Sequence, residues 1–160
     1  AAATHKVGAL RRDPMAMLPF CGYNMGDYFR HWLNIGKKLS HPPKIFSVNW
    51  FMEDENNKVI WPGFGENIRV LKWIIDRVNN NAGAKETAIG LIPGLKDLNL
   101  NGLCIPEDKL KKLFEINNSE WQSELIDIEK FLSQFGEHTP AEIWQEYKKL
   151  EGQILDVGQV

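Results

Sequence analysis

The sequence predicts an α/β fold with few strands and a predominantly helical C-terminal tail. Three apolar stripes at helical spacing fill the last third of the chain, and one run rich in β-branched and aromatic residues lies in its first third. The chain has 160 residues, of which 43% are apolar and 25% are charged, and this is sufficient for a domain with its own core. No internal repeat and no linker interrupts the pattern, so we expect residues 1–160 to form a single unit.

The N-terminal part of the chain should pass from irregular backbone into a helix. Residues 1–23 show no sustained period, and prolines at positions 14 and 19 favour extended or looped backbone. Asn24 can cap the helix that follows, with Asp27 near its positive end. Gly36 and the two prolines at 42 and 43 should end this helix. Its apolar stripe consists of Tyr28, Trp32 and Ile35.

The middle of the chain alternates between strand and helix patterns. The run at 44–51 (KIFSVNWF) is the best strand candidate, because it is entered from two prolines and rich in β-branched and aromatic residues. Residues 53–58 are polar and typical of an exposed turn, and 59–61 can form a short returning strand. A helix is predicted at 66–79, and 87–92 is a further strand candidate. The residues expected to face inward from that helix are Val70, Leu71, Ile74 and Val78.

A helical tail is predicted at 106–155, with a start signal before each of three helices. Pro106 suits the first turn of a helix because its φ angle is fixed. Ser119 with Gln122, and Thr139 with Glu142, have the spacing of capping boxes. The apolar stripes are Leu110, Leu113 and Phe114, then Trp121, Leu125, Ile128 and Leu132, then Ile143, Tyr147, Leu150 and Ile154.

Charge and cysteine content exclude several classes of protein. The 19 basic and 21 acidic residues give a net charge of −2 without a concentrated basic face, so we expect no nucleic acid as a partner. No apolar run approaches the roughly 18 residues that cross a bilayer, so we expect no membrane partner. Cys21 and Cys104 lie far apart without CxxC partners, which favours free thiols and a reducing compartment.

The most unusual segment is WPGFGEN at 61–67. Glycines on both sides of Phe64 allow positive φ angles and can bring the ring to the surface of a tight turn. The turn leads into a helix, whose first N–H groups favour an anion. If the preceding strand lies beside this turn, Phe51 and Phe64 can hold a flat base between them. Asn67 can read the edge of a base because its amide both donates and accepts hydrogen bonds.

A second interpretation makes Trp61 and Phe64 core aromatics and leaves the glycines only the role of shaping a turn. Spacing alone favours this second interpretation. The GxG pattern lacks the third glycine of a dinucleotide-binding fingerprint, and the chain contains no Gly-x-x-x-x-Gly-Lys-Ser/Thr sequence. The residue pattern of 61–67 therefore leaves both interpretations open.

Candidates for catalysis are few. Cys21 has no identifiable basic neighbour to activate its thiol, so a small apolar role is favoured over a nucleophile. Asp54 and Glu55 lie in the polar turn and are interpreted as solvating residues. We assign no catalytic and no metal-binding residue, and the chain shows no complete active site. The histidines, none of which has metal-ligand spacing to a neighbour, are His5, His31, His41 and His138.

Four motifs, in order and with matching spacing, resemble consecutive landmarks of the GTP-dependent phosphoenolpyruvate carboxykinase family. They are PFCGYNMG at 19–26, HWL at 31–33, VNWF at 48–51 and WPGFGEN at 61–67. The similarity continues through the terminal helices and covers almost the whole chain. It implies the C-terminal part of a nucleotide-binding lobe, in a fragment that begins inside a longer protein.

The resemblance also implies a reaction and a site. The family interconverts oxaloacetate and GTP with phosphoenolpyruvate, carbon dioxide and GDP, uses manganese or magnesium, and serves gluconeogenesis. Within a guanine-pocket region at 44–79, Phe51 and Phe64 would sandwich guanine. Its edge would be read by Asn67 and by the backbone from Phe64 through Gly65 and Glu66. Residues 1–6 resemble part of the family's mobile lid, which closes over substrates and excludes water.

Three positions depart from the family pattern. Val59 stands where many relatives have a third pocket aromatic, Leu18 where an arginine is expected, and Ile68 where a small polar residue is usual. The family's kinase loop, manganese ligands and oxaloacetate-binding arginines lie upstream, so we do not expect the fragment alone to catalyse the reaction. We expect a monomer located in the cytoplasm, with the mitochondrial matrix as the alternative.

Two other classes of function compete with a nucleotide-binding enzyme segment. A non-catalytic helical interaction module would use every aromatic residue as core. An RNA-binding or cap-binding module would also stack a purine between aromatic rings, but it would need a basic surface. Solvent-inaccessible Phe51 and Phe64 would favour the interaction module.

Overall fold

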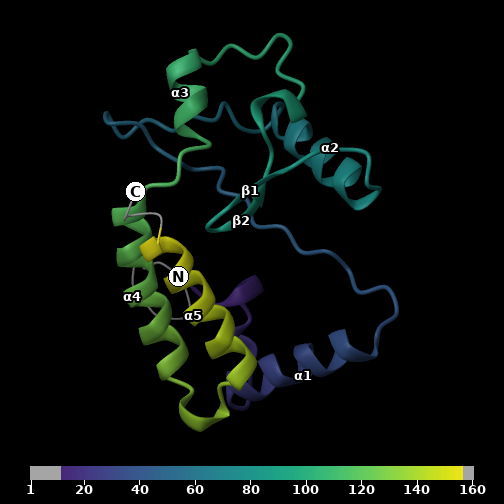
Figure 1. Ribbon diagram of the computed structural model, residues 1–160, viewed down its shortest axis with the longest axis vertical. Coiled ribbons are helices and arrows are strands. Elements are labelled where there is room, and N and C mark those ends of the chain that lie inside the picture. The colour runs from purple at the N-terminus through teal and green to yellow at the C-terminus, as the bar shows by residue number, and fades with distance from the viewer. Residues whose placement is uncertain (1–11, 157–160) are drawn as a thin grey trace. The chain divides into compact units, whose positions relative to one another are not determined.

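The computed structural model describes residues 12–156, which divide into two compact units. Unit 1 combines the N-terminal segment up to Pro42 with the C-terminal segment from Asn118, and unit 2 consists of Pro43–Asn117. In the described residues the chain forms five α-helices and one two-stranded antiparallel sheet (Figure 1). The predicted class, a small α/β fold with a helical C-terminal tail, is therefore confirmed. The assignment of residues 1–160 to a single unit stays a prediction.

Unit 1 is helical over the part of it that the structure describes. Its helices are α1 (Met25–Lys38), α4 (Asn118–Ser133) and α5 (Ala141–Asp156), and α4 lies beside α5 (Figure 1). Two short 3-10 turns, at Pro14–Ala16 and Leu18–Phe20, precede α1. The stripes of α4 and α5 face inward as predicted, with Leu125, Leu132, Tyr147 and Ile154 buried.

The N-terminus of α1 is fixed by the residue predicted to cap it. The Asn24 side chain accepts a hydrogen bond from the Gly26 N–H at 2.8 Å and donates one to the Phe135 carbonyl at 3.2 Å. Asp27 lies in the first turn, where the helix dipole favours a carboxylate. The ring of Phe29, on the next turn, packs edge-on against Phe135 with centroids 5.8 Å apart. The predicted cap therefore also joins α1 to the connection between α4 and α5.

Unit 2 contains a hairpin and two further helices. The helices are α2 (Asn67–Val78) and α3 (Glu107–Lys112), and β1 (Lys85–Thr87) pairs antiparallel with β2 (Gly90–Ile92). The register sets Lys85 opposite Ile92 and Thr87 opposite Gly90. The range predicted as one strand, 87–92, instead holds the last residue of β1, the turn and all of β2. The buried apolar side chains of the unit are Ile60, Trp61, Trp73 and Leu98.

The strand predicted at 44–51 is wrong. These residues form no strand, and near them only an isolated bridge joins Glu53 to Val59. A strand needs a partner for its backbone groups, and in residues 12–156 none runs beside this segment. Its β-branched side chains, Ile45 and Val48, are exposed. Phe46 instead packs edge-on against Trp73, with ring centroids 6.0 Å apart.

Helix α2 agrees with the range predicted at 66–79, but its inward face differs. Trp73 is its buried residue, with Val70 and Ile74 half-buried beside it. Leu71 and Val78, which were predicted to face inward, are exposed. None of the helices in residues 12–156 combines the length and the apolar character needed to cross a membrane.

Candidate functional site

The segment 61–67 forms a tight turn that leads directly into α2. Gly63 has a φ angle of 83°, in the region where glycine is favoured, and the Glu66 N–H donates to the Gly63 carbonyl at 2.8 Å. Gly65 does not adopt the positive φ angle that a glycine allows. A Cβ at Gly65 would meet no atom within 4 Å, so the backbone there is open to the approach of a ligand.

The two aromatic rings predicted to hold a base both lie at the surface. Phe64 is 99% exposed and Phe51 is 76% exposed. Trp61, in contrast, is only 6% exposed and belongs to the core of unit 2. The interpretation of this turn as a purely structural feature therefore fits Trp61 and fails for Phe64. An interaction module with every aromatic in its core does not describe this chain.

Asn67, the first residue of α2, is held by the indole of Trp61. The Trp61 Nε1–H donates to Asn67 Oδ1 at 2.8 Å. Within residues 12–156 the Asn67 amide makes no other hydrogen bond, so its NH₂ group is free to donate. The amide is half-buried and still reachable from solvent.

Arg69 braces the turn from within α2 and was missed by the sequence interpretation. Its guanidinium forms an ion pair with Glu66 and donates to the carbonyls of Asn99 and Asn101, the latter at 3.0 Å. The signal available in the sequence was the spacing of Glu66 and Arg69, three residues apart at a helix start. The partners at 99 and 101 are about thirty residues away and carried no signal.

The turn at 53–58 was interpreted as solvating, and for Asp54 this is wrong. Asp54 is 6% exposed, and its Oδ1 accepts hydrogen bonds from the Asn56 N–H at 2.9 Å and the Lys58 N–H at 3.0 Å. Its second oxygen pairs with Lys109 on α3. The hydrogen bond from Lys109, followed by those from Lys58 and Asn56, lowers the pKa of Asp54 to about 2. Asp54 is therefore an ionised structural residue, whereas Glu55 is exposed as expected.

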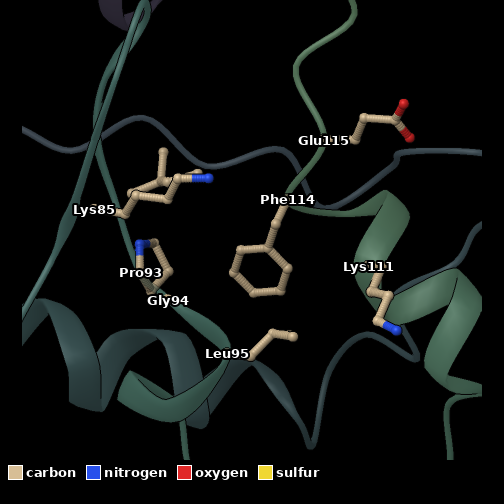
Figure 2. Close-up of a pocket in the computed structure, with 8 residues that line it drawn as sticks. Lys85, Pro93, Gly94, Leu95, Lys111, Phe114 and Glu115 are labelled. Carbon is tan, nitrogen blue, oxygen red and sulfur yellow. The ribbon is translucent and has the colours of Figure 1, made fainter.

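A separate cavity of about 270 Å³ lies elsewhere in unit 2. Figure 2 shows the ring of Phe114 pointing into it, with Lys85 and Lys111 on opposite sides. Its remaining lining residues are Ile92, Pro93, Gly94, Leu95 and Glu115. None of the residues predicted to bind a nucleotide lines this cavity.

The remaining candidates within residues 12–156 do not assemble into a catalytic or metal centre. His31 and His41 are exposed, and His138 pairs with Asp27 at 2.9 Å. Cys21 is a half-buried free thiol. In residues 12–156 no three His, Cys, Asp or Glu side chains are grouped so that they could hold a metal ion. His5 and the predicted lid segment at 1–6 lie outside the described residues.

Comparison with known proteins gives a consistent match along the chain. A family model described as the phosphoenolpyruvate carboxykinase C-terminal P-loop domain matches residues 1–153. A protein of Thermoplasma volcanium named phosphoenolpyruvate carboxykinase [GTP] is 52% identical over 92% of this chain and 25% of its own length. Proteins of the same name from Corynebacterium kroppenstedtii and Chlamydia muridarum are 48% and 44% identical, each over 96% of this chain. The chain thus spans about a quarter of the length of these relatives.

Proposed function

Because the chain belongs to the GTP-dependent phosphoenolpyruvate carboxykinase family, we propose that it is the guanine-binding, C-terminal portion of such an enzyme. The complete enzyme would convert oxaloacetate and GTP to phosphoenolpyruvate, GDP and carbon dioxide, a step of gluconeogenesis. In this proposal residues 1–160 are the C-terminal part of the enzyme's nucleotide-binding domain.

The observation that carries the proposal is the exposure of Phe51 and Phe64. Apolar rings of this size are normally covered, and Phe64 is 99% exposed on a turn whose Trp61 is buried. A purine offers each ring a flat partner, and stacking contributes about 1–3 kcal/mol per base in comparable sites. Because both side chains are largely exposed, a ring face of each is available to a base.

The edge of the base would be read by groups at the start of α2. The Asn67 NH₂ group is free, and the open space beside Gly65 lets a base approach the backbone from Phe64 to Glu66. Arg69 keeps the Glu66 side chain turned toward α2. The base would therefore meet a turn whose shape is fixed before binding, which lowers the entropy lost on association.

The residues described here do not fit the manganese or magnesium ion that the family uses. Hard cations of this kind are held by several oxygen ligands, and no suitable group of side chains exists between residues 12 and 156. We propose that the metal ligands and the catalytic residues lie in the part of the enzyme outside this chain. The 160-residue chain alone would then bind nucleotide at most and would not turn over substrate.

Three further parts of the proposal rest on the family relationship. Residues 1–6 would contribute to the mobile lid over the active site. The enzyme would act as a monomer in the cytoplasm, or in the mitochondrial matrix. Val59 and Ile68 are exposed close to the turn in sequence and would line its edge with aliphatic groups where relatives have other residues.

Nucleotide titration of the intact protein tests the site. GTP should quench the fluorescence of Trp50 and Trp61, and Phe64→Ala should raise the Kd for GTP at least tenfold, because one stacking face is lost. Leu91→Ala removes an exposed apolar side chain from β2 of the same unit and should leave the Kd unchanged. Equal Kd values for Phe64→Ala and wild type would rule out this pocket.

A further inference from the structure

We propose that Trp61 is a positioning residue for nucleotide choice: its indole N–H orients the Asn67 amide so that the amide selects purines with an acceptor at position 6. The inference rests on the proposed function, since it concerns the same base-binding turn. It goes further by naming the group that decides between guanine and adenine.

The orientation of the Asn67 amide follows from the chemistry of its partner. The oxygen and nitrogen of an asparagine side chain have almost the same shape, so position alone does not distinguish them. The indole N–H, however, only donates. The atom 2.8 Å from Trp61 Nε1 must therefore be the acceptor, Oδ1, and the NH₂ group must point the other way.

Both ends of this hydrogen bond are attached to well-held backbone. Trp61 is 6% exposed, and the Ile60 N–H before it donates to the Met52 carbonyl at 2.9 Å. Asn67 is already part of α2. Turning the amide over would place NH₂ against N–H and leave a buried indole donor without an acceptor, which is costly. The amide is therefore set in one orientation before any nucleotide binds.

The consequence is a donor presented to the base. Guanine carries an acceptor, O6, at the position where adenine carries the N6 amino donor. The Asn67 NH₂ group can donate to O6, whereas against N6 two donors would face each other. Trp61 thus converts an ambiguous side chain into one that accepts GTP and rejects ATP, without itself touching the nucleotide.

The test compares kcat/KM for inosine triphosphate and ATP in the intact enzyme. Inosine triphosphate keeps O6 but lacks the 2-amino group of guanine, so its ratio to ATP isolates the readout at position 6. Trp61→Phe keeps an aromatic ring and removes the N–H. We expect the ratio of kcat/KM for inosine triphosphate to that for ATP to fall about tenfold. An amide free to turn over no longer always donates to O6 and no longer always opposes the N6 donor of adenine, and the change is on the scale of one hydrogen bond.

Trp73→Phe is the matched control. Trp73 is 5% exposed in the same unit, and its indole N–H donates to the Gly83 carbonyl at 3.0 Å, a backbone group rather than a base-reading side chain. Its loss should lower kcat/KM for both nucleotides together and leave their ratio unchanged. If Trp61→Phe also leaves the ratio unchanged, Trp61 is only a core residue and the inference is overturned.

A second variant tests the orientation without altering the tryptophan. Asn67→Asp keeps an acceptor for Trp61 and replaces the NH₂ group by an oxygen, and a carboxylate is well tolerated at the start of a helix. The ratio should fall further than in Trp61→Phe, because the new oxygen repels O6 and accepts from N6. An unchanged ratio in Asn67→Asp would overturn the inference even where Trp61→Phe does not fold.

The two proposals fail in different ways. If Phe64→Ala leaves GTP binding unchanged, the base does not bind at this turn and the proposed site is wrong. Alternatively, Phe64→Ala weakens GTP binding while Trp61→Phe and Asn67→Asp keep the wild-type ratio of kcat/KM for inosine triphosphate to that for ATP. In that case the proposed site stands and only the role of Trp61 is overturned.

Discussion

Lys109 and Asp54 form an ion pair that fastens α3 to the turn at 53–58 across 55 positions of sequence. The Asp54 carboxylate also accepts hydrogen bonds from two backbone N–H groups of its own turn. One buried side chain therefore shapes the turn and attaches it to a helix, both within unit 2.

The pH dependence of this turn follows from the lowered pKa of Asp54. The pKa is about 2 in the folded protein, against an ordinary value of 3.8, so the carboxylate stabilises the fold above pH 4 and this contribution is lost as the pH falls toward 2. Hydrogen exchange at residues 53–58 and in α3, corrected for the intrinsic effect of pH, should show protection decreasing over this window. Asp54→Asn should lose protection already at pH 7 and should change less than the wild type between pH 4 and 2.

Glu55→Gln is the control for that measurement. Glu55 is exposed and its nitrogen–oxygen distance to Lys112 is 3.5 Å, so its removal should have little effect. If Asp54→Asn kept the wild-type loss of protection in acid, another group would be responsible.

Gly26 and Gly36 lie on the same helix and should respond in opposite directions to alanine. A Cβ at Gly26 would lie 2.6 Å from the backbone carbon and oxygen of His138, so Gly26→Ala should destabilise α1 by about 1–3 kcal/mol. A Cβ at Gly36 meets nothing within 4 Å, so Gly36→Ala should stabilise it by about 0.5–1 kcal/mol. Hydrogen-exchange protection of the α1 amides in the intact protein measures the effect of each variant. Similar effects of the two variants would contradict the close packing of Gly26 against His138.

The buried hydroxyl of Thr139 should matter more than an exposed one on the neighbouring helix. Thr139 Oγ1 donates to the Leu132 carbonyl at 2.9 Å, at the end of α4 where carbonyls lack helical partners. Thr139→Val should cost about 1 kcal/mol of local stability, read from exchange protection in α4 and α5. Ser123→Ala removes an exposed hydroxyl bond to Ser119 and should change stability by less than about 0.5 kcal/mol. A larger loss of stability in Ser123→Ala than in Thr139→Val would show that burial of the hydroxyl does not determine its contribution to stability.

What the sequence predicts well in this protein is local. Asn24 caps α1 through a contact two residues away, and the stripe of α5 buries Tyr147 and Ile154, so spacing was enough. The exposed position of Phe64 also follows from the glycine before it. These features depend on residues within one or two helical turns of each other.

What the sequence predicts poorly depends on distant partners. The run at 44–51 has the composition of a strand but no neighbouring strand in the described chain, and composition does not supply one. Asp54 is polar and lies in a turn, yet Lys109 makes it a buried anchor. The orientation of the Asn67 amide depends on which atom of Trp61 reaches it, and no residue pattern encodes that.

The division of the chain has a consequence for how the protein is made. Unit 1 consists of one sequence segment before unit 2 and one after it. The Asn24 side chain bonds to the Phe135 carbonyl, which is synthesised 111 positions later. At about 5–20 residues per second, a ribosome needs roughly 5 to 20 s to supply that partner. Unit 2 is continuous in the sequence, whereas α1 must remain without its contact to Phe135 for this interval. A chaperone could therefore bind the nascent α1 during this interval.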